Sequence, residues 1–172
     1  MVGPLFLFVG AVLFLNGIWI LGKIQDREIA IINIFVGGLG VLIVTLAFLQ
    51  NQPASYEFGG YVLLFAFTYL WVAYNRFVNP DGAGLGWFCL FVALTALPVS
   101  FTVLSGAGGR PFSIWLGLDW LAWAVLWFLY FVLLALRRSS IGTLVGWLTL
   151  VEGIVTAWIP GYLVMSGRLA TG

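Results

Sequence analysis

Apolar residues along this chain form long continuous runs, and polar or charged residues occur mainly in the short gaps between them. Each run is about 20 residues long, the length of an α-helix that crosses the hydrocarbon core of a bilayer. Lipid cannot hydrogen-bond exposed backbone amides, so such runs must be helical. The predicted spans are residues 3–22, 29–49, 58–77, 85–105, 114–136 and 142–165.

The gaps between these runs are too short to hold a domain outside the membrane. We therefore predict an all-α integral membrane protein whose six transmembrane helices form one domain over residues 1–172. Stretches beginning at Phe35, Phe91 and Leu150 are weakly similar to one another. A repeat of this kind indicates three helical hairpins of similar plan.

Composition supports a membrane location, because 63% of the residues are apolar and 8% are charged. A soluble domain of this size could not cover itself with so few polar groups. The first run lacks the basic start and the cleavage motif of a signal peptide, so we expect a retained span. We therefore expect membrane lipid to surround the protein.

The basic residues predict the orientation of the chain. Five of them lie at or just after the ends of the first, third and fifth runs: Lys23, Arg27, Arg76, Arg137 and Arg138. The opposite ends of the spans hold Arg110 and Arg168. Because cytoplasmic loops are enriched in Lys and Arg, we expect a multi-pass protein of the cytoplasmic membrane with both termini extracytoplasmic.

Charge and residue inventory exclude several classes of function. The net charge of +1 gives no reason to expect a nucleic-acid partner. The chain contains no histidine and one cysteine, Cys89, which can form no internal disulfide. No metal-ligand cluster and no nucleophile paired with a base are visible, so we expect no metal, no cofactor and no enzymatic activity.

The fifth run carries a stripe of large side chains. On a helix, Leu116, Trp120, Trp123 and Trp127 fall within roughly 60° of one another and rise over about 16 Å. Trp127 lies near the bilayer centre, too deep for the aromatic belt at the interface. This position favours a functional role over packing. Asp119, at the outer edge, is expected to face water.

The sixth run carries an acid close to the membrane midplane. Thr149, Glu152 and Thr156 cluster within roughly 60° on a helix. A carboxyl group at this depth faces the bundle interior by default. Two roles for Glu152 remain open: a structural acid that accepts hydrogen bonds from neighbouring helices, or direct contact with a substrate.

Five further positions in the first three runs are candidates for helix packing or for a pore. Asn16 in the first run is expected either to hydrogen-bond another helix or to line a pore. Phe65 fits aromatic packing or a constriction, whereas the Tyr69 hydroxyl needs a partner far from the headgroups. In the second run, Gly37 and Gly38 would let another helix approach closely.

Four stretches together resemble the AmiS/UreI family of amide and urea channels. They are NIFVGGL at 33–39, LLFAFTYL at 63–70, WLAWAVLW at 120–127 and EGIVTAWIP at 152–160, in family order. The resemblance implies a six-helix protomer with both termini outside the cytoplasm. It also implies a homo-oligomeric ring of six protomers, each with its own pore. Position by position, Phe65, Tyr69, Trp120, Trp123 and Trp127 match aromatic residues of the constrictions, and Glu152 matches a buried acid.

Two departures place the chain closer to ungated amide transporters than to acid-activated urea channels. Leu116 stands where acid-activated members have a tryptophan, which implies a wider or more apolar outer constriction. Acid gating usually needs histidine, which is absent, and the outer loop at Gln50 is short.

The sequence therefore predicts a passive channel for urea and short aliphatic amides, not gated by acid and functionally coupled to a cytoplasmic amidase or urease. The alternative is a proton-coupled small-solute transporter that uses Glu152 as its carrier. The predicted pore-lining residues are Asn16, Phe65, Tyr69, Leu116, Trp120, Trp123, Trp127, Glu152 and Thr156.

Overall fold

The computed structural model describes residues 2–171, and every regular element in that range is a helix. Six spans are long and apolar enough to cross a membrane, which confirms the predicted fold class of a multi-pass α-helical protein. The first five are α1 (Val2–Ile20), α2 (Ile29–Phe48), α3 (Pro53–Val78), α4 (Ala83–Ser105) and α5 (Pro111–Leu134). The sixth joins η1 (Ser139–Ile141), α6 (Gly142–Glu152), the π-helix η2 (Gly153–Trp158) and α7 (Ile159–Met165).

Helix boundaries follow local backbone chemistry. α3 and α5 begin with Pro53 and Pro111, whose missing N–H has no intrahelical partner at the first position. For this reason α3 starts before the predicted residue 58, and α5 before residue 114. At the end of α3, Asn79 adopts the left-handed conformation with φ 54°. Gly82 does the same with φ 80° where α4 begins, so the connecting turn is tight.

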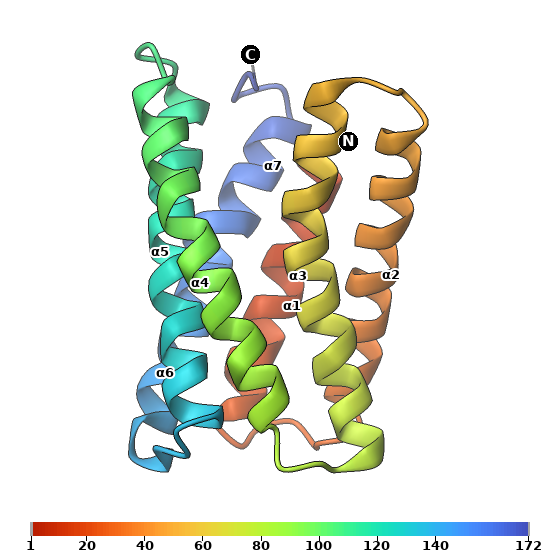
Figure 1. Ribbon diagram of the computed structural model, residues 1–172, viewed down its shortest axis with the longest axis vertical. Coiled ribbons are helices and arrows are strands. Elements are labelled where there is room, and N and C mark those ends of the chain that lie inside the picture. Colours follow the sequence, from red (N-terminus) through yellow and green to blue (C-terminus); the bar gives the residue numbers. More distant parts are fainter. Residues whose placement is uncertain (1, 172) are drawn as a thin grey trace.

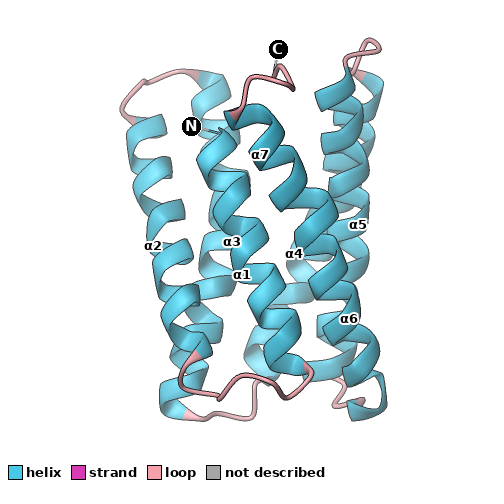
Figure 2. Cartoon of the chain, turned by 180° about the vertical axis from the view of Figure 1, so that it is seen from behind, coloured by secondary structure: helices cyan, strands magenta, loops and turns pink. Residues whose placement is uncertain are grey.

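The six spans pack as three antiparallel pairs (Figures 1 and 2). α2 pairs with α3, and α4 pairs with α5. The third pair brings the two ends of the chain together, because α1 packs along α6, η2 and α7. Both termini therefore lie at one end of the bundle, and the loops after α1, α3 and α5 lie at the other end (Figure 1).

Glycines make the third pair unusually close. A Cβ atom on Gly10 of α1 would lie 2.5 Å from the backbone nitrogen of Trp158. One on Gly153 would lie 2.8 Å from the backbone nitrogen of Phe14. Small residues at such contacts let helix backbones pack directly in a membrane. The glycines of this seam are Gly3, Gly10 and Gly17 on α1, and Gly146, Gly153 and Gly161 on the last span.

The glycine spacing shows where the last span departs from an α-helix. On α1 the seam glycines recur at intervals of seven residues. On the last span the interval is seven from Gly146 to Gly153 and eight from Gly153 to Gly161. The longer interval contains η2, whose turns hold more residues than α-helical turns. The π-helix thus absorbs one extra residue and keeps Gly161 against α1.

Ion pairs and an aromatic contact fix the end of the bundle that lacks the termini. Arg76 donates to Asp26 at 2.9 Å, and its guanidinium lies 4.8 Å from the ring centroid of Trp19. Arg137 bonds Asp81 at 2.7 Å. The first pair ties the loop after α1 to α3, and the second ties the loops after α3 and α5 to each other.

We expect Gly10→Ala to destabilise the protein by about 1–3 kcal/mol, because the added methyl group must push two backbones apart. The melting temperature in detergent measures this cost. Gly38→Ala is the matched control, since a Cβ there would have no neighbour from another helix of the described chain within 4 Å. Gly38, unlike Gly37, therefore makes no close helix contact within residues 2–171. Equal melting temperatures for the two variants would contradict the seam.

Candidate functional site

The ring of Phe65 is the centre of an aromatic cluster between α3 and α5. Its centroid lies 5.5 Å from Trp120, 4.9 Å from Trp123 and 4.7 Å from Trp127. All three contacts are edge-to-face, the arrangement that aromatic quadrupoles favour. The stripe predicted on the fifth run therefore faces the bundle interior and meets α3.

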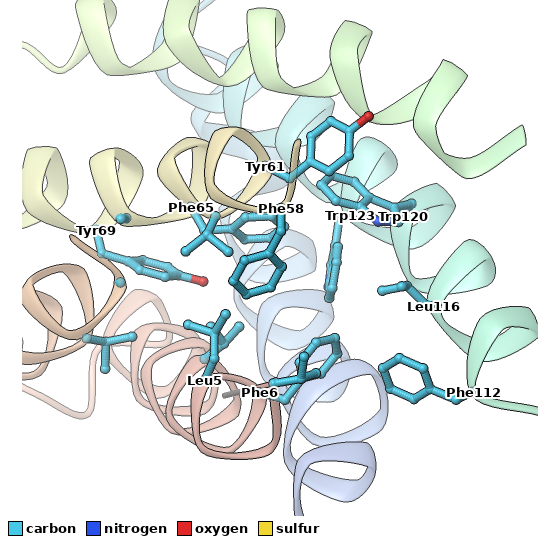
Figure 3. Close-up of a pocket in the computed structure, with 16 residues that line it drawn as sticks. Leu5, Phe6, Phe58, Tyr61, Phe65, Tyr69, Phe112, Leu116, Trp120 and Trp123 are labelled. Carbon is cyan, nitrogen blue, oxygen red and sulfur yellow. The ribbon is translucent and has the colours of Figure 1, made fainter. Parts of the chain in front are cut away.

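A cavity of about 140 Å³ lies on the side of this cluster toward the termini (Figure 3). Its walls come from α1, α2, α3 and α5, and they are almost entirely apolar. The predicted residues Phe65, Tyr69, Leu116, Trp120 and Trp123 all line this outer cavity. Other lining residues include Leu5, Phe6, Phe58, Tyr61 and Phe112.

A second, inner cavity of about 30 Å³ lies between α1, α3, α4 and α5. The predicted residues Asn16 and Trp127 line it, together with Thr68, Cys89 and Tyr130. Tyr69 borders both cavities. Figure 3 shows its hydroxyl pointing toward the outer cavity, and this buried group has no hydrogen-bond partner within residues 2–171.

Thr156 and Glu152 lie behind the aromatic wall and border neither of these two cavities. The indole N–H of Trp123 donates to Thr156 Oγ1 at 2.8 Å. The Thr156 hydroxyl in turn donates to the backbone carbonyl of Glu152 at 2.7 Å. Glu152 is buried, and its Oε2 atom has no hydrogen-bond partner in the described part of the chain.

Asp119 does not face water as expected, because its exposed fraction is 3%. The prediction took it to be at the outer edge of the span, but α5 starts at Pro111, so Asp119 lies about 12 Å along the helix. Its Oδ2 atom makes no hydrogen bond to any residue from 2 to 171. The bundle therefore holds a second buried acid besides Glu152.

Asn16 has both of the environments considered for it. Its side chain exchanges two hydrogen bonds with Asn33 of α2, at 3.1 and 2.7 Å. It also borders the inner cavity. The sequence reasoning missed Asn33, although a second buried amide one span away could have identified the partner.

The walls contributed by α1 and by the start of α3 were also missed in the sequence. Leu5 and Val9 lie one helical turn apart on α1 and both border the outer cavity. Phe58 and Tyr61 do the same on α3. In a run that is apolar on all sides, such spacing does not distinguish a cavity wall from a lipid-facing surface.

Comparison with known proteins identifies the family. The model of the AmiS/UreI family transporters matches residues 1–168, so the chain belongs to this family. This confirms the resemblance seen in the four sequence stretches. The chain is therefore a transporter and not an enzyme.

Relatives cover nearly the whole chain. A Mycolicibacterium smegmatis protein whose name describes a transporter of amidate substrates is 44% identical over 167 residues, which cover 96% of this chain and 76% of the relative. A Helicobacter pylori protein named as an acid-activated urea channel is 34% identical over 191 residues, covering 95% and 96% of the two chains. The crystal structure of the Helicobacter pylori urea channel matches with a TM-score of 0.86 at 34% identity, over 99% of this chain and 100% of that one.

We expect Asn33→Leu to lower stability by about 1 kcal/mol, because it leaves the Asn16 amide buried without its partner. The melting temperature in detergent measures the loss. The double variant Asn16→Leu/Asn33→Leu should recover part of it, since both polar groups are then removed. A double variant less stable than the sum of the two single changes would contradict this pairing.

Proposed function

We propose that this protein is a passive channel for urea and short aliphatic amides, not gated by acid. The observation that carries the proposal is the pair of cavities that both border Tyr69, beside Phe65 and its three indoles. A permeant would pass from the outer cavity along the aromatic cluster to the inner cavity.

The chemistry of the walls suits neutral, flat molecules. Urea and short amides carry no charge, and a planar molecule slides between ring faces and edges. A hydrated ion cannot leave its water for apolar walls, because nothing there replaces the lost hydration. The Tyr69 hydroxyl offers a permeant one hydrogen bond, which is weak enough to allow release.

The outer cavity favours amides with a short alkyl group. Its lining is apolar, and Leu116 presents an aliphatic side chain where the aromatic stripe ends. A methyl group gains from such a wall, whereas a second amino group, as in urea, does not. The amidate transporter name of the Mycolicibacterium smegmatis relative supports the same preference.

The proposal that the pore is ungated rests on the titratable groups of the chain. A switch near pH 6 normally uses histidine, and the sequence contains none. The relative named as an acid-activated channel gives no reason by itself to assign acid gating here. We therefore propose that the pore stays open over the physiological pH range.

Orientation and assembly complete the proposal. The end of the bundle with the loops after α1, α3 and α5 carries five of the seven basic residues, which favours a cytoplasmic location for this end and an extracytoplasmic location for both termini. The protein would sit in the cell membrane as a homo-oligomer of six protomers. Its permeant would feed a cytoplasmic amidase or urease.

A second candidate is a proton-coupled transporter that uses Glu152. The buried Oε2 atom, without a partner among residues 2–171, favours it. Against it, Glu152 borders neither cavity, so a permeant would not contact the carboxyl group directly.

We expect purified protein in liposomes to conduct acetamide and urea faster than glycerol. Stopped-flow light scattering measures the three rates. Acetamide flux should vary less than about twofold between pH 5 and pH 7.5, because no histidine titrates in that interval. An imposed pH gradient should also leave the acetamide flux unchanged. Uptake driven by the gradient and lost in Glu152→Gln would establish the proton-coupled alternative.

We expect Trp127→Ala to lower the ratio of acetamide flux to glycerol flux about tenfold, which corresponds to about 1.4 kcal/mol of discrimination. The variant removes one of the three indoles against Phe65 and widens the passage. Trp147→Ala is the control, since Trp147 is 56% exposed on the outside of α6. The same ratio of acetamide flux to glycerol flux in both variants would show that the permeant does not pass Trp127.

A further inference from the structure

Trp123 contacts three other rings of the aromatic wall. Its ring lies 4.9 Å from Phe65, 5.4 Å from Trp120 and 6.1 Å from Phe6, measured between centroids. It also lines the outer cavity (Figure 3). A small rotation of this ring would therefore change the width of the passage beside Phe65.

Packing alone does not fix the plane of such a ring. The second side-chain torsion of tryptophan is broad, so ring contacts leave the ring plane some freedom that a hydrogen bond to its N–H removes. Trp123 has such a holder, because its N–H donates to Thr156 Oγ1 at 2.8 Å. Within residues 2–171, it is the one indole of the three around Phe65 whose N–H donates to a protein acceptor.

The Thr156 hydroxyl is itself fixed as an acceptor toward the indole. Its one hydrogen is used in the 2.7 Å bond to the Glu152 carbonyl. An indole nitrogen can only donate, so the direction of the Trp123 bond is determined. Both groups are at least nine-tenths buried, which protects the bond from competition by water.

The π-helix explains why Thr156 reaches Trp123. Thr156 lies within η2, where the wider turn changes the direction of each following side chain relative to an α-helix. The same segment keeps Gly153 and Gly161 on the α1 seam. η2 thus faces α1 with Gly153 and α5 with the Thr156 hydroxyl group.

We infer that Thr156 is a positioning residue that sets the selectivity of the channel by holding the plane of the Trp123 ring. This inference rests on the proposed function, because it assumes that the permeant passes this ring. Thr156 does not touch the permeant, since it borders neither cavity. Its effect therefore acts through the indole N–H alone.

The test compares two variants that remove the two halves of the bond. Thr156→Val keeps the shape of the side chain and removes the acceptor, and Trp123→Phe keeps a ring and removes the donor. Each should lower the ratio of acetamide flux to glycerol flux about tenfold in liposomes. Thr156→Ser should restore the natural ratio, because it supplies the same oxygen.

Thr95→Val is the matched control. Thr95 bonds the carbonyl of Phe91 at 2.8 Å in the same way that Thr156 bonds that of Glu152, but it is half-buried on α4 and accepts no indole N–H among residues 2–171. Its flux ratio should equal that of the natural chain. This control separates loss of a hydroxyl inside a helix from loss of the indole anchor.

The double variant Thr156→Val/Trp123→Phe should be no worse than either single variant, because both break the same bond. Additive effects, or a natural ratio in folded Thr156→Val, would overturn the inference and leave the proposed function intact. If Thr156→Val fails to assemble, Trp123→Phe is measured alone and in combination with Thr156→Ser. A natural ratio of acetamide flux to glycerol flux in Trp123→Phe then overturns the inference. A natural chain that conducts no amide would overturn both.

Discussion

The packing of Phe65 against three indoles is the contact on which the rest of this protein depends. It separates an outer cavity from an inner one and makes the wall between them aromatic. Rings in edge-to-face contact interlock, so none can move far without displacing another. Three spans hold this cluster in place: α3 supplies Phe65, α5 supplies the indoles, and the last span fixes Trp123 through Thr156.

The last span can do this because it is not a regular helix. An α-helix with glycines at intervals of seven residues would stay close to α1 along its length. The π-helix adds a residue between Gly153 and Gly161 while keeping both glycines on the seam. The change of side-chain direction that results brings Thr156 against α5. The π-helix and the glycine seam therefore act together to place Thr156 where it holds the ring of Trp123.

Polar groups inside the bundle follow the rules of a membrane interior. Asn16 and Asn33 satisfy each other, and the Ser100 hydroxyl donates to the Gly117 carbonyl at 2.7 Å. Asp119 and Glu152 differ, because each keeps a buried carboxyl oxygen without a partner among residues 2–171. Buried acids are costly in a bilayer, and both of these lie on the α5 and α6 side of the bundle.

The sequence predicted most of the fold and one wall of the site. Run length and the lack of water in a bilayer determine the six spans, and the spacing of Trp120, Trp123 and Trp127 places them on one helix face. The register of an ideal helix also placed Glu152 and Thr156 on one polar stripe. It did not distinguish a stripe that faces a cavity from one that supports a neighbouring side chain.

Two other features needed the packed structure. The burial of Asp119 depends on which helices cover α5, and no local pattern reports that. The pairing of α1 with the last span joins opposite ends of the chain, so a model that pairs consecutive spans does not predict it. The glycine intervals of seven and eight residues were visible in the sequence, but their meaning depends on knowing that the two spans touch.

Cysteine labelling of the outer cavity wall tests the central claim most directly. In a Cys89→Ala background, Leu116→Cys places a thiol on the cavity wall, and Leu118→Cys places one on the exposed surface of α5, where Leu118 is 53% exposed. Acetamide flux into liposomes is measured before and after treatment with a small neutral thiol reagent. If solute passes the aromatic cluster, labelling should block acetamide flux through Leu116→Cys and leave the flux through Leu118→Cys unchanged. Full flux through labelled Leu116→Cys would show that solute does not pass the aromatic cluster.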